Sequence, residues 1–262
     1  MSNGKREGKL ISPQMVLFEF RNTIGNPYVH IFGVGMPVLM MIIIIRAMSA
    51  QVTDAAMRAD MSTSVFLGIG VLIPLATVFM GYGVSHAQEL EKGIPQRMEL
   101  FGIRTSVSLC NRILSEMIFM LLAFCIYFTV GCFFVDMKRP SLPGAALYIL
   151  CIFVLSVILF CLSYAISSML RKFSLTYCVT MILYFAMMIL GGMMGISYDN
   201  LPSAVQAIAK LLPVTYINRD FYMVWKGEHY NFVPMLQSYL FLAALAGILL
   251  FLALRRMSRR LH

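Results

Sequence analysis

Six long stretches without Asp, Glu, Lys or Arg limit what this chain can fold into. They are 27–45, 61–83, 117–135, 140–170, 173–198 and 231–254. About 20 apolar residues let a helix cross the hydrocarbon core of a bilayer, and a helix satisfies its own backbone hydrogen bonds there. One such stretch could be a buried helix of a soluble protein, but six could not. The chain is 60% hydrophobic and 13% charged, against about 45–50% and 25% in soluble domains. We therefore predict an all-α integral membrane protein with six transmembrane helices.

Lys and Arg lie unevenly between the two sides of the predicted membrane. With six spans, fourteen of the 21 fall on the side of the two chain ends and seven on the other. The positive-inside rule then places both ends in the cytoplasm of a multi-pass cell-membrane protein, and a bacterial plasma membrane is expected. A net charge of +9 can also indicate nucleic-acid binding. Because these charges flank the spans, membrane lipids are the expected partners and nucleic acid is not.

A single domain is expected, with a lead at 1–26, a six-helix membrane region at 27–254 and a basic tail at 255–262. Residues 1–12 are polar and are expected to be disordered. The segment 13–26 predicts an amphipathic helix in the plane of the inner interface, with an apolar face formed by Val16, Leu17, Phe20 and Ile24. Glu19 and Arg21 fall elsewhere on the helical wheel. A frayed leader is the alternative.

The connection between the second and third spans is the most informative stretch. It carries Gln88, Glu89, Glu91 and Lys92 before a break at Gly93 and Pro95, and then Arg97 and Glu99. Gly and Pro end helices. We therefore expect a charged helical segment, a break and a second short helix on the cytoplasmic side, with the third span starting near Arg112.

The segment 197–234, before the last span, is long for a connection. Val205, Ile208 and Leu212 share one helical face, and 218–226 is a second amphipathic piece with three aromatic side chains. Short re-entrant helices that dip into the outer leaflet would explain apolar faces interrupted by Pro. An ordinary solvated loop is the alternative.

Familiar chemical motifs are missing from the sequence. It holds no G-x-x-x-x-G-K-[ST] phosphate loop, no H-E-x-x-H zinc helix, no G-x-S-x-G elbow and no C-x-x-C pair. No catalytic residue, metal site or bound cofactor is therefore expected. Ion-coupled carriers usually need buried charges, and the spans offer only Glu116 and His30 near their ends. An ion-coupled carrier and a membrane-embedded enzyme remain alternative functions.

Two further features of the spans each allow two interpretations, and a third points to a dimer seam. Glu116 could contact a substrate, or it could pair with Arg112 one turn earlier. Met187 and the other methionines of the fifth span could line an apolar path, or they could pack or face lipid. Gly191 and Gly192 would allow close helix approach at a dimer seam.

The order of these segments resembles the membrane subunit of a type-2 ABC exporter, a family that includes bacterial drug and polysaccharide exporters. The resemblance rests on three places: Asn26-Pro27 after the interfacial helix, the charged run 88–93, and the outer pattern from Leu201-Pro202 to Tyr216. It extends over nearly the whole chain.

The resemblance implies a mechanism. Two copies, or this chain and a homologue, would form the membrane domain, and a separate cytoplasmic ATPase would bind ATP and Mg²⁺. The segment 89–100 would be the coupling helix that contacts the ATPase, through Gln88, Glu89, Glu91, Lys92, Arg97 and Glu99. The segment 13–26, with Val16, Phe20 and Arg21, would be the connecting helix beside it. The apolar, Met-rich spans favour a hydrophobic or amphipathic cargo such as a drug, lipid or peptide.

Overall fold

The computed structural model describes residues 11–103, 105–194 and 198–258, and every regular element within these ranges is helical. The expectations for residues 1–10 and 259–262 lie outside the described residues. The elements are α1 (Pro13–Ile24), α2 (Pro27–His30), η1 (Ile31–Gly35), α3 (Met36–Ser49), α4 (Ala55–Gly70), α5 (Leu72–Pro74), η2 (Leu75–Tyr82), α6 (Gly83–Glu91), α7 (Ile94–Leu100), α8 (Thr105–Phe134), α9 (Leu142–Leu170), α10 (Phe173–Leu190), η3 (Tyr198–Asn200), α11 (Ser203–Ala209), α12 (Pro213–Arg219), α13 (Phe221–Lys226) and α14 (Val233–Ser258). The prediction of an all-α membrane protein is confirmed.

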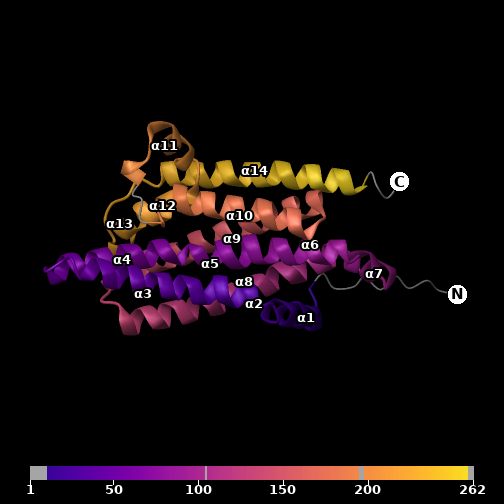
Figure 1. Ribbon diagram of the computed structural model, residues 1–262, viewed down its shortest axis with the longest axis horizontal. Helices are drawn as coiled ribbons and strands as arrows, with labels where there is room; N and C mark the ends of the chain where they lie inside the picture. Colours follow the sequence, from indigo (N-terminus) through magenta and orange to yellow (C-terminus); the bar gives the residue numbers. More distant parts are fainter. Residues whose placement is uncertain (1–10, 104, 195–197, 259–262) are drawn as a thin grey trace.

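Six helices of the described part are long and apolar enough to cross a membrane. They are Ile31–Ser49, Ala55–Glu91, Val107–Phe134, Leu142–Leu170, Phe173–Leu190 and Val233–Arg256, one for each uncharged stretch of the sequence. The long helices run side by side along the longest axis of the molecule (Figure 1). The third begins earlier than expected, since α8 starts at Thr105 rather than near Arg112.

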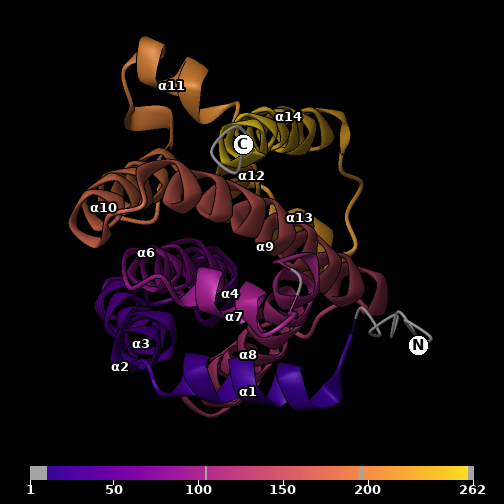
Figure 2. The ribbon, with the colours of Figure 1, turned by 90° about the vertical axis from the view of Figure 1, so that its right-hand side faces the viewer.

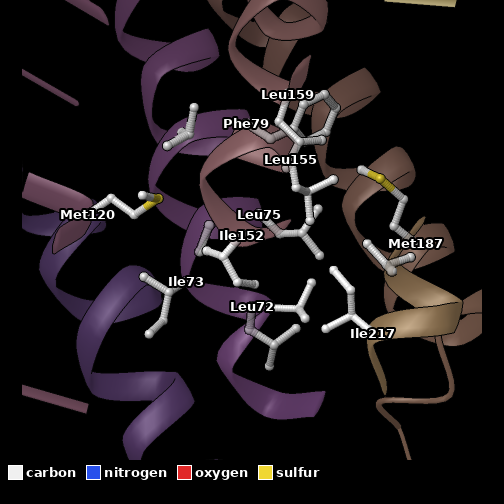
Figure 3. Packing of buried hydrophobic residues seen from close by; sticks show 14 of the residues in the cluster. Leu72, Ile73, Leu75, Phe79, Met120, Ile152, Leu155, Leu159, Met187 and Ile217 are labelled. Carbon is white, nitrogen blue, oxygen red and sulfur yellow. The ribbon is translucent and has the colours of Figure 1, made fainter. Parts of the chain in front are cut away.

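The second span is the centre of the bundle. It runs over 37 residues as α4, α5, η2 and α6, and 83% of its apolar stretch is buried inside the molecule. At about 1.5 Å per residue a helix of this length exceeds the thickness of the hydrocarbon core, so part of it extends beyond the core. Figure 3 shows its Leu72, Leu75 and Phe79 packed among side chains of α8, α9, α10 and α12.

A π-helical turn occurs in each of the first two spans, and the two turns are in contact. Gly33 of η1 lies against Thr77 of η2, where an added Cβ would come 2.3 Å from the Thr77 methyl carbon. The glycine thus permits the close approach of the two spans. The π-helical turn of the first span comprises Ile31–Gly35, and Pro37 follows it in α3.

The α1 helix lies across one end of the bundle (Figure 2). The α7 helix and the C-terminal part of α14 lie at this same end, and α11, α12 and α13 lie at the opposite end (Figure 1). We call these the α1 end and the α12 end. At the α1 end the predicted break before α7 is confirmed, because Gly93 has a positive φ of 68° that favours glycine. Arg171 lies in the short turn between α9 and α10, with a φ of 57°.

The α12 end is closely packed and held by hydrogen bonds to the backbone. Asn218 of α12 donates from Nδ2 to the Gly191 carbonyl at 2.7 Å, and its side chain fills the space that a Cβ on Gly68 would need. Trp225 donates from Nε1 to the Lys138 carbonyl at 3.1 Å. The α12 helix is therefore wedged between α4 and the end of α10.

The outer segment forms three short helices where two amphipathic pieces were expected. The first piece ends at Ala209 as α11. Pro213 begins α12, because proline suits the first turn of a helix. The second piece begins at Phe221 as α13 rather than at Asn218. Whether these helices dip into a leaflet stays a prediction.

Candidate functional site

A buried ion-pair network lies at the α1 end, centred on Arg112 of α8. Its Nη1 lies 2.6 Å from Glu19 Oε2 of α1 and 3.0 Å from Glu89 Oε1 of α6, and its Nε lies 3.4 Å from Glu116 Oε1 one turn along α8. The side chains of Arg112, Glu19 and Glu116 are 6%, 5% and 2% exposed. One guanidinium therefore connects three helices. The predicted pairing of Glu116 with Arg112 is confirmed.

Uncharged side chains complete this network. Thr23 of α1 donates from Oγ1 to Glu116 Oε1 at 2.9 Å, and Asn22 donates from Nδ2 to Glu89 Oε1 at 3.1 Å. The backbone N–H of Ser12, just before α1, donates to Asn111 Oδ1 of α8 at 2.9 Å. The α1 helix is thus fastened to α8 at both of its ends and to α6 by one further bond.

The face of α1 that packs on α8 is polar. Glu19 and Thr23 are the buried residues of the helix, while Leu17 and Ile24 are 50% and 44% exposed. Val16 and Phe20 are half-buried and Arg21 is exposed. The predicted helix is present, and part of its apolar stripe is exposed. Its buried face is set by Arg112, far away in sequence.

The network carries more negative than positive charge. Three carboxyl groups surround one guanidinium, and removing charges from water is costly unless they are paired. Burial raises the pKa of the Glu19 carboxyl, and Arg112 opposes this rise. The cluster is consequently sensitive to any change in the position or charge of Arg112.

Aromatic contacts connect the network to the bundle core. The Arg112 guanidinium carbon lies 5.4 Å from the ring centre of Tyr82, and that ring stacks on Phe160 of α9 at 4.2 Å. His86 Nδ1 lies 2.9 Å from Ser167 Oγ, also in α9. A displacement of α6 would therefore reach α8 and α9 through packed groups.

The predicted coupling residues fall into two groups. Glu89 faces inward to Arg112, and Glu91 accepts a hydrogen bond at 2.9 Å from the backbone N–H of Phe173 at the start of α10. Lys92, Arg97 and Glu99 are exposed, and Glu99 accepts a hydrogen bond from Thr105. Gln88 lies at the wall of a cavity described below. The structure thus joins Glu89 and Glu91 to the spans and leaves the other charged residues at the surface.

Two apolar side chains that we did not select stand out at the end of α7. Leu100 is 87% exposed and Phe101 is 85% exposed, at the α1 end of the molecule. Exposed large apolar side chains beside charged ones are typical of a protein interface. The sequence could have indicated this pair, since Leu100 and Phe101 directly follow the charged residue Glu99.

A cavity of about 550 Å³ lies between α1, α6, α7 and α8. Arg112, Glu19 and Glu89 line it together with Tyr82 and Phe18, and Arg21 and Lys92 also contribute to its walls. Its volume is in the range of small-ligand sites. The ion-pair network is therefore bordered by open space on one side.

The residues predicted for a pathway or interface lie elsewhere. Met187 is buried in the core, and Gly191 is buried against Met193 and Val214, at the edge of the α12 wedge. Gly192 is half-buried with a φ of 76°. Their roles in transport or dimer formation stay predictions. No group of His, Cys, Asp and Glu that could hold a metal is present among the described residues.

Comparison with known proteins gives one match. The family model described as "ABC-2 type transporter" matches residues 14–224, which include α1, the whole ion-pair network, α7 and the α12 wedge. No curated protein and no solved structure matches the chain.

Proposed function

Because the chain belongs to the ABC-2 type transporter family and is thus a membrane permease subunit that associates with an ABC ATPase, we propose that it works as an exporter. In this proposal two permease chains form the membrane domain in a bacterial plasma membrane, with both ends in the cytoplasm. ATP and Mg²⁺ bind to the separate ATPase. The cargo is hydrophobic or amphipathic, since the surfaces of the spans are apolar.

The buried network around Arg112 is the observation that carries the mechanism. The ATPase would contact α7 through Arg97, Glu99, Leu100 and Phe101. Two connections lead to other spans from the end of α6, which directly precedes α7. One runs through Glu89 to Arg112 and one through Glu91 to the start of α10. A movement of α7 driven by nucleotide binding would therefore shift α6, α8 and α1 together.

Leu100 and Phe101 supply the apolar part of this contact. Aromatic and large apolar side chains in the centre of an interface commonly carry much of its binding energy. The charged neighbours would orient the encounter and contribute less to affinity.

The experiment is a pull-down of the partner ATPase on the purified permease in detergent. The double variant Leu100→Asn/Phe101→Asn should lose most of the bound ATPase while keeping the unfolding temperature of the wild-type chain. Phe133→Asn/Leu142→Asn is the matched control, because these residues are 81% and 89% exposed and lie at the ends of α8 and α9 away from α7. Equal recovery of the ATPase by both double variants would contradict the proposed contact.

A further inference from the structure

The wall of the cavity at the α1 end carries carboxylate oxygens that lack partners. Arg112 pairs with Glu19 through Oε2 and with Glu89 through Oε1. Among the described residues no hydrogen bond reaches Glu19 Oε1 or Glu89 Oε2. Glu19 is only 4% exposed, and it lines the cavity together with Glu89. A donor in the cavity would therefore find these two carboxylate oxygens as acceptors.

The net negative charge of the network also favours a hydrogen-bond donor, in particular one that is positively charged. Glu19, Glu89 and Glu116 exceed the single positive charge of Arg112 by two when all are ionised. A ligand cation beside Glu19 and Glu89 would lower this excess. A primary ammonium fits best, because it supplies both positive charge and N–H donors.

The exposed part of the cavity wall has the opposite character. Arg21 of α1 and Lys92 at the end of α6 are both exposed. Neither makes an ion pair within the described part of the chain. Arg and Lys are the common phosphate-binding side chains. A ligand that matches both parts has an ammonium near Glu19 and Glu89 and a phosphate near Arg21 and Lys92.

The outward face of α1 adds an apolar requirement. Leu17, Phe18 and Ile24 of α1 are 50%, 60% and 44% exposed, and Ile11 just before the helix is 53% exposed. Phe18 also lines the cavity. An amphipathic helix that shows an apolar face and a basic residue outward is suited to the headgroup region of a bilayer. Acyl chains would cover this face beside the cavity.

We propose that the cavity binds the headgroup of a phospholipid that carries a primary ammonium, of the phosphatidylethanolamine type. The ammonium donates to Glu19 and Glu89, the phosphodiester lies between Arg21 and Lys92, and the acyl chains run along the exposed face of α1. The bound lipid would hold α1 in place beside the network. The inference goes beyond the proposed function and does not need the ATPase, so its failure would leave the α7 contact unaffected.

The test is native mass spectrometry of the full chain, purified in detergent and mixed with equal amounts of phosphatidylethanolamine and phosphatidylglycerol. One phosphatidylethanolamine should be retained per chain in preference to phosphatidylglycerol, which lacks the ammonium. In the double variant Arg21→Gln/Lys92→Gln, retention should fall about 30-fold, given the usual contribution of two basic residues near a headgroup. The variant Arg97→Gln/Lys172→Gln has the same change of charge at exposed positions outside the cavity and should retain the lipid.

A second measurement keeps the proposal open to refutation if a variant is poorly folded. Phosphatidylethanolamine with a photoreactive headgroup should cross-link to peptides of α1, α6 or α7 in the wild-type chain. Water-soluble glycerophosphoethanolamine, which has the headgroup alone, should compete weakly. Equal retention of both lipids, equal loss in the two double variants, or cross-links elsewhere would overturn the proposal. Full competition by glycerophosphoethanolamine would show a soluble ligand and would also overturn it.

Discussion

The two ends of the bundle are held together in different ways. At the α12 end, Asn218 and Trp225 donate to backbone carbonyls, and α12 fits between α4 and α10 with no room for a Cβ on Gly68. At the α1 end, side-chain ion pairs around Arg112 join α1, α6 and α8 beside a cavity of about 550 Å³.

The difference indicates which end can move. Close packing is intolerant of small displacements, so the α12 end should keep its arrangement as one body. Ion pairs with several partners and open space beside them can exchange partners. We therefore expect the conformational changes of transport to begin at the α1 end, and each prediction below tests this contrast.

The largest effect is expected for Arg112→Gln. Three carboxyl groups would lose their common cation, and breaking a buried pair in this way costs about 3–5 kcal/mol. The thermal unfolding midpoint in detergent should fall strongly, and recovery of α1–α8 contacts by cross-linking should fall with it. A wild-type midpoint would show that the network does not hold the α1 end.

The loss of stability in Arg112→Gln should depend on pH. Because the folded-state pKa of Glu19 is already raised by burial, folding favours its protonated form, and the stability that this carboxyl contributes is lost as pH rises through that pKa. Without Arg112 the pKa should rise further. The deficit of Arg112→Gln relative to wild type should therefore shrink on acidification, as measured by unfolding midpoints across a pH series. A deficit that does not change with pH would contradict this explanation.

The next effect is expected at the α12 end, for Gly68→Ala. The new Cβ would come 1.6 Å from Asn218 Oδ1, so α12 must shift, at a cost of about 1–3 kcal/mol for overpacking. Gly247→Ala is the control, because nothing lies within 4 Å of its added Cβ. The deficit of Gly68→Ala should not vary with pH, in contrast to that of Arg112→Gln. Identical midpoints for both alanine variants would show that the wedge is loosely packed.

A smaller effect is expected for Thr23→Val. The substitution keeps the shape of the side chain and removes the donor to the buried Glu116 Oε1, which should cost about 1–3 kcal/mol. The variant should weaken the coupling between the ATPase and the spans more than it lowers stability. Stimulation of the partner ATPase by the permease should therefore fall. Unchanged stimulation together with a lowered midpoint would limit Thr23 to a structural role.

The smallest effect is expected for Trp225→Phe. It removes one hydrogen bond to the Lys138 carbonyl at a cost of about 1 kcal/mol, while the ring remains in the core. The unfolding midpoint should fall slightly and stimulation of the ATPase should not change. Loss of stimulation at wild-type stability would show that the α12 end also takes part in coupling.

The sequence predicted the features that depend on local composition. The uncharged stretches located all six spans, and the Gly93 and Pro95 break located α7, because hydropathy and backbone preferences act over short distances.

The sequence did not predict the features that depend on distant partners. The buried face of α1 follows from the pairing of Glu19 with Arg112, residues 93 positions apart, and no periodicity in α1 shows this. The wedge of Asn218 against Gly68 depends on a contact between residues that lie far apart in the sequence. The absence of a side chain on Gly68 makes room for this contact, but the sequence does not show which residue fills the space.

The central claim is that the network around Arg112 transmits movement from the ATPase to the spans, and a distance measurement tests it without knowledge of the cargo. Spin labels would be attached at Gln14 of α1 and at Lys210 after α11, both exposed, in the permease assembled with its ATPase. In the wild type the distance should change when ATP binds. In Arg112→Lys, which keeps the charge but lacks the planar group that spans several carboxylates, the ATPase should remain bound and the distance should stay unchanged. The same nucleotide-dependent change in Arg112→Lys would contradict the claim.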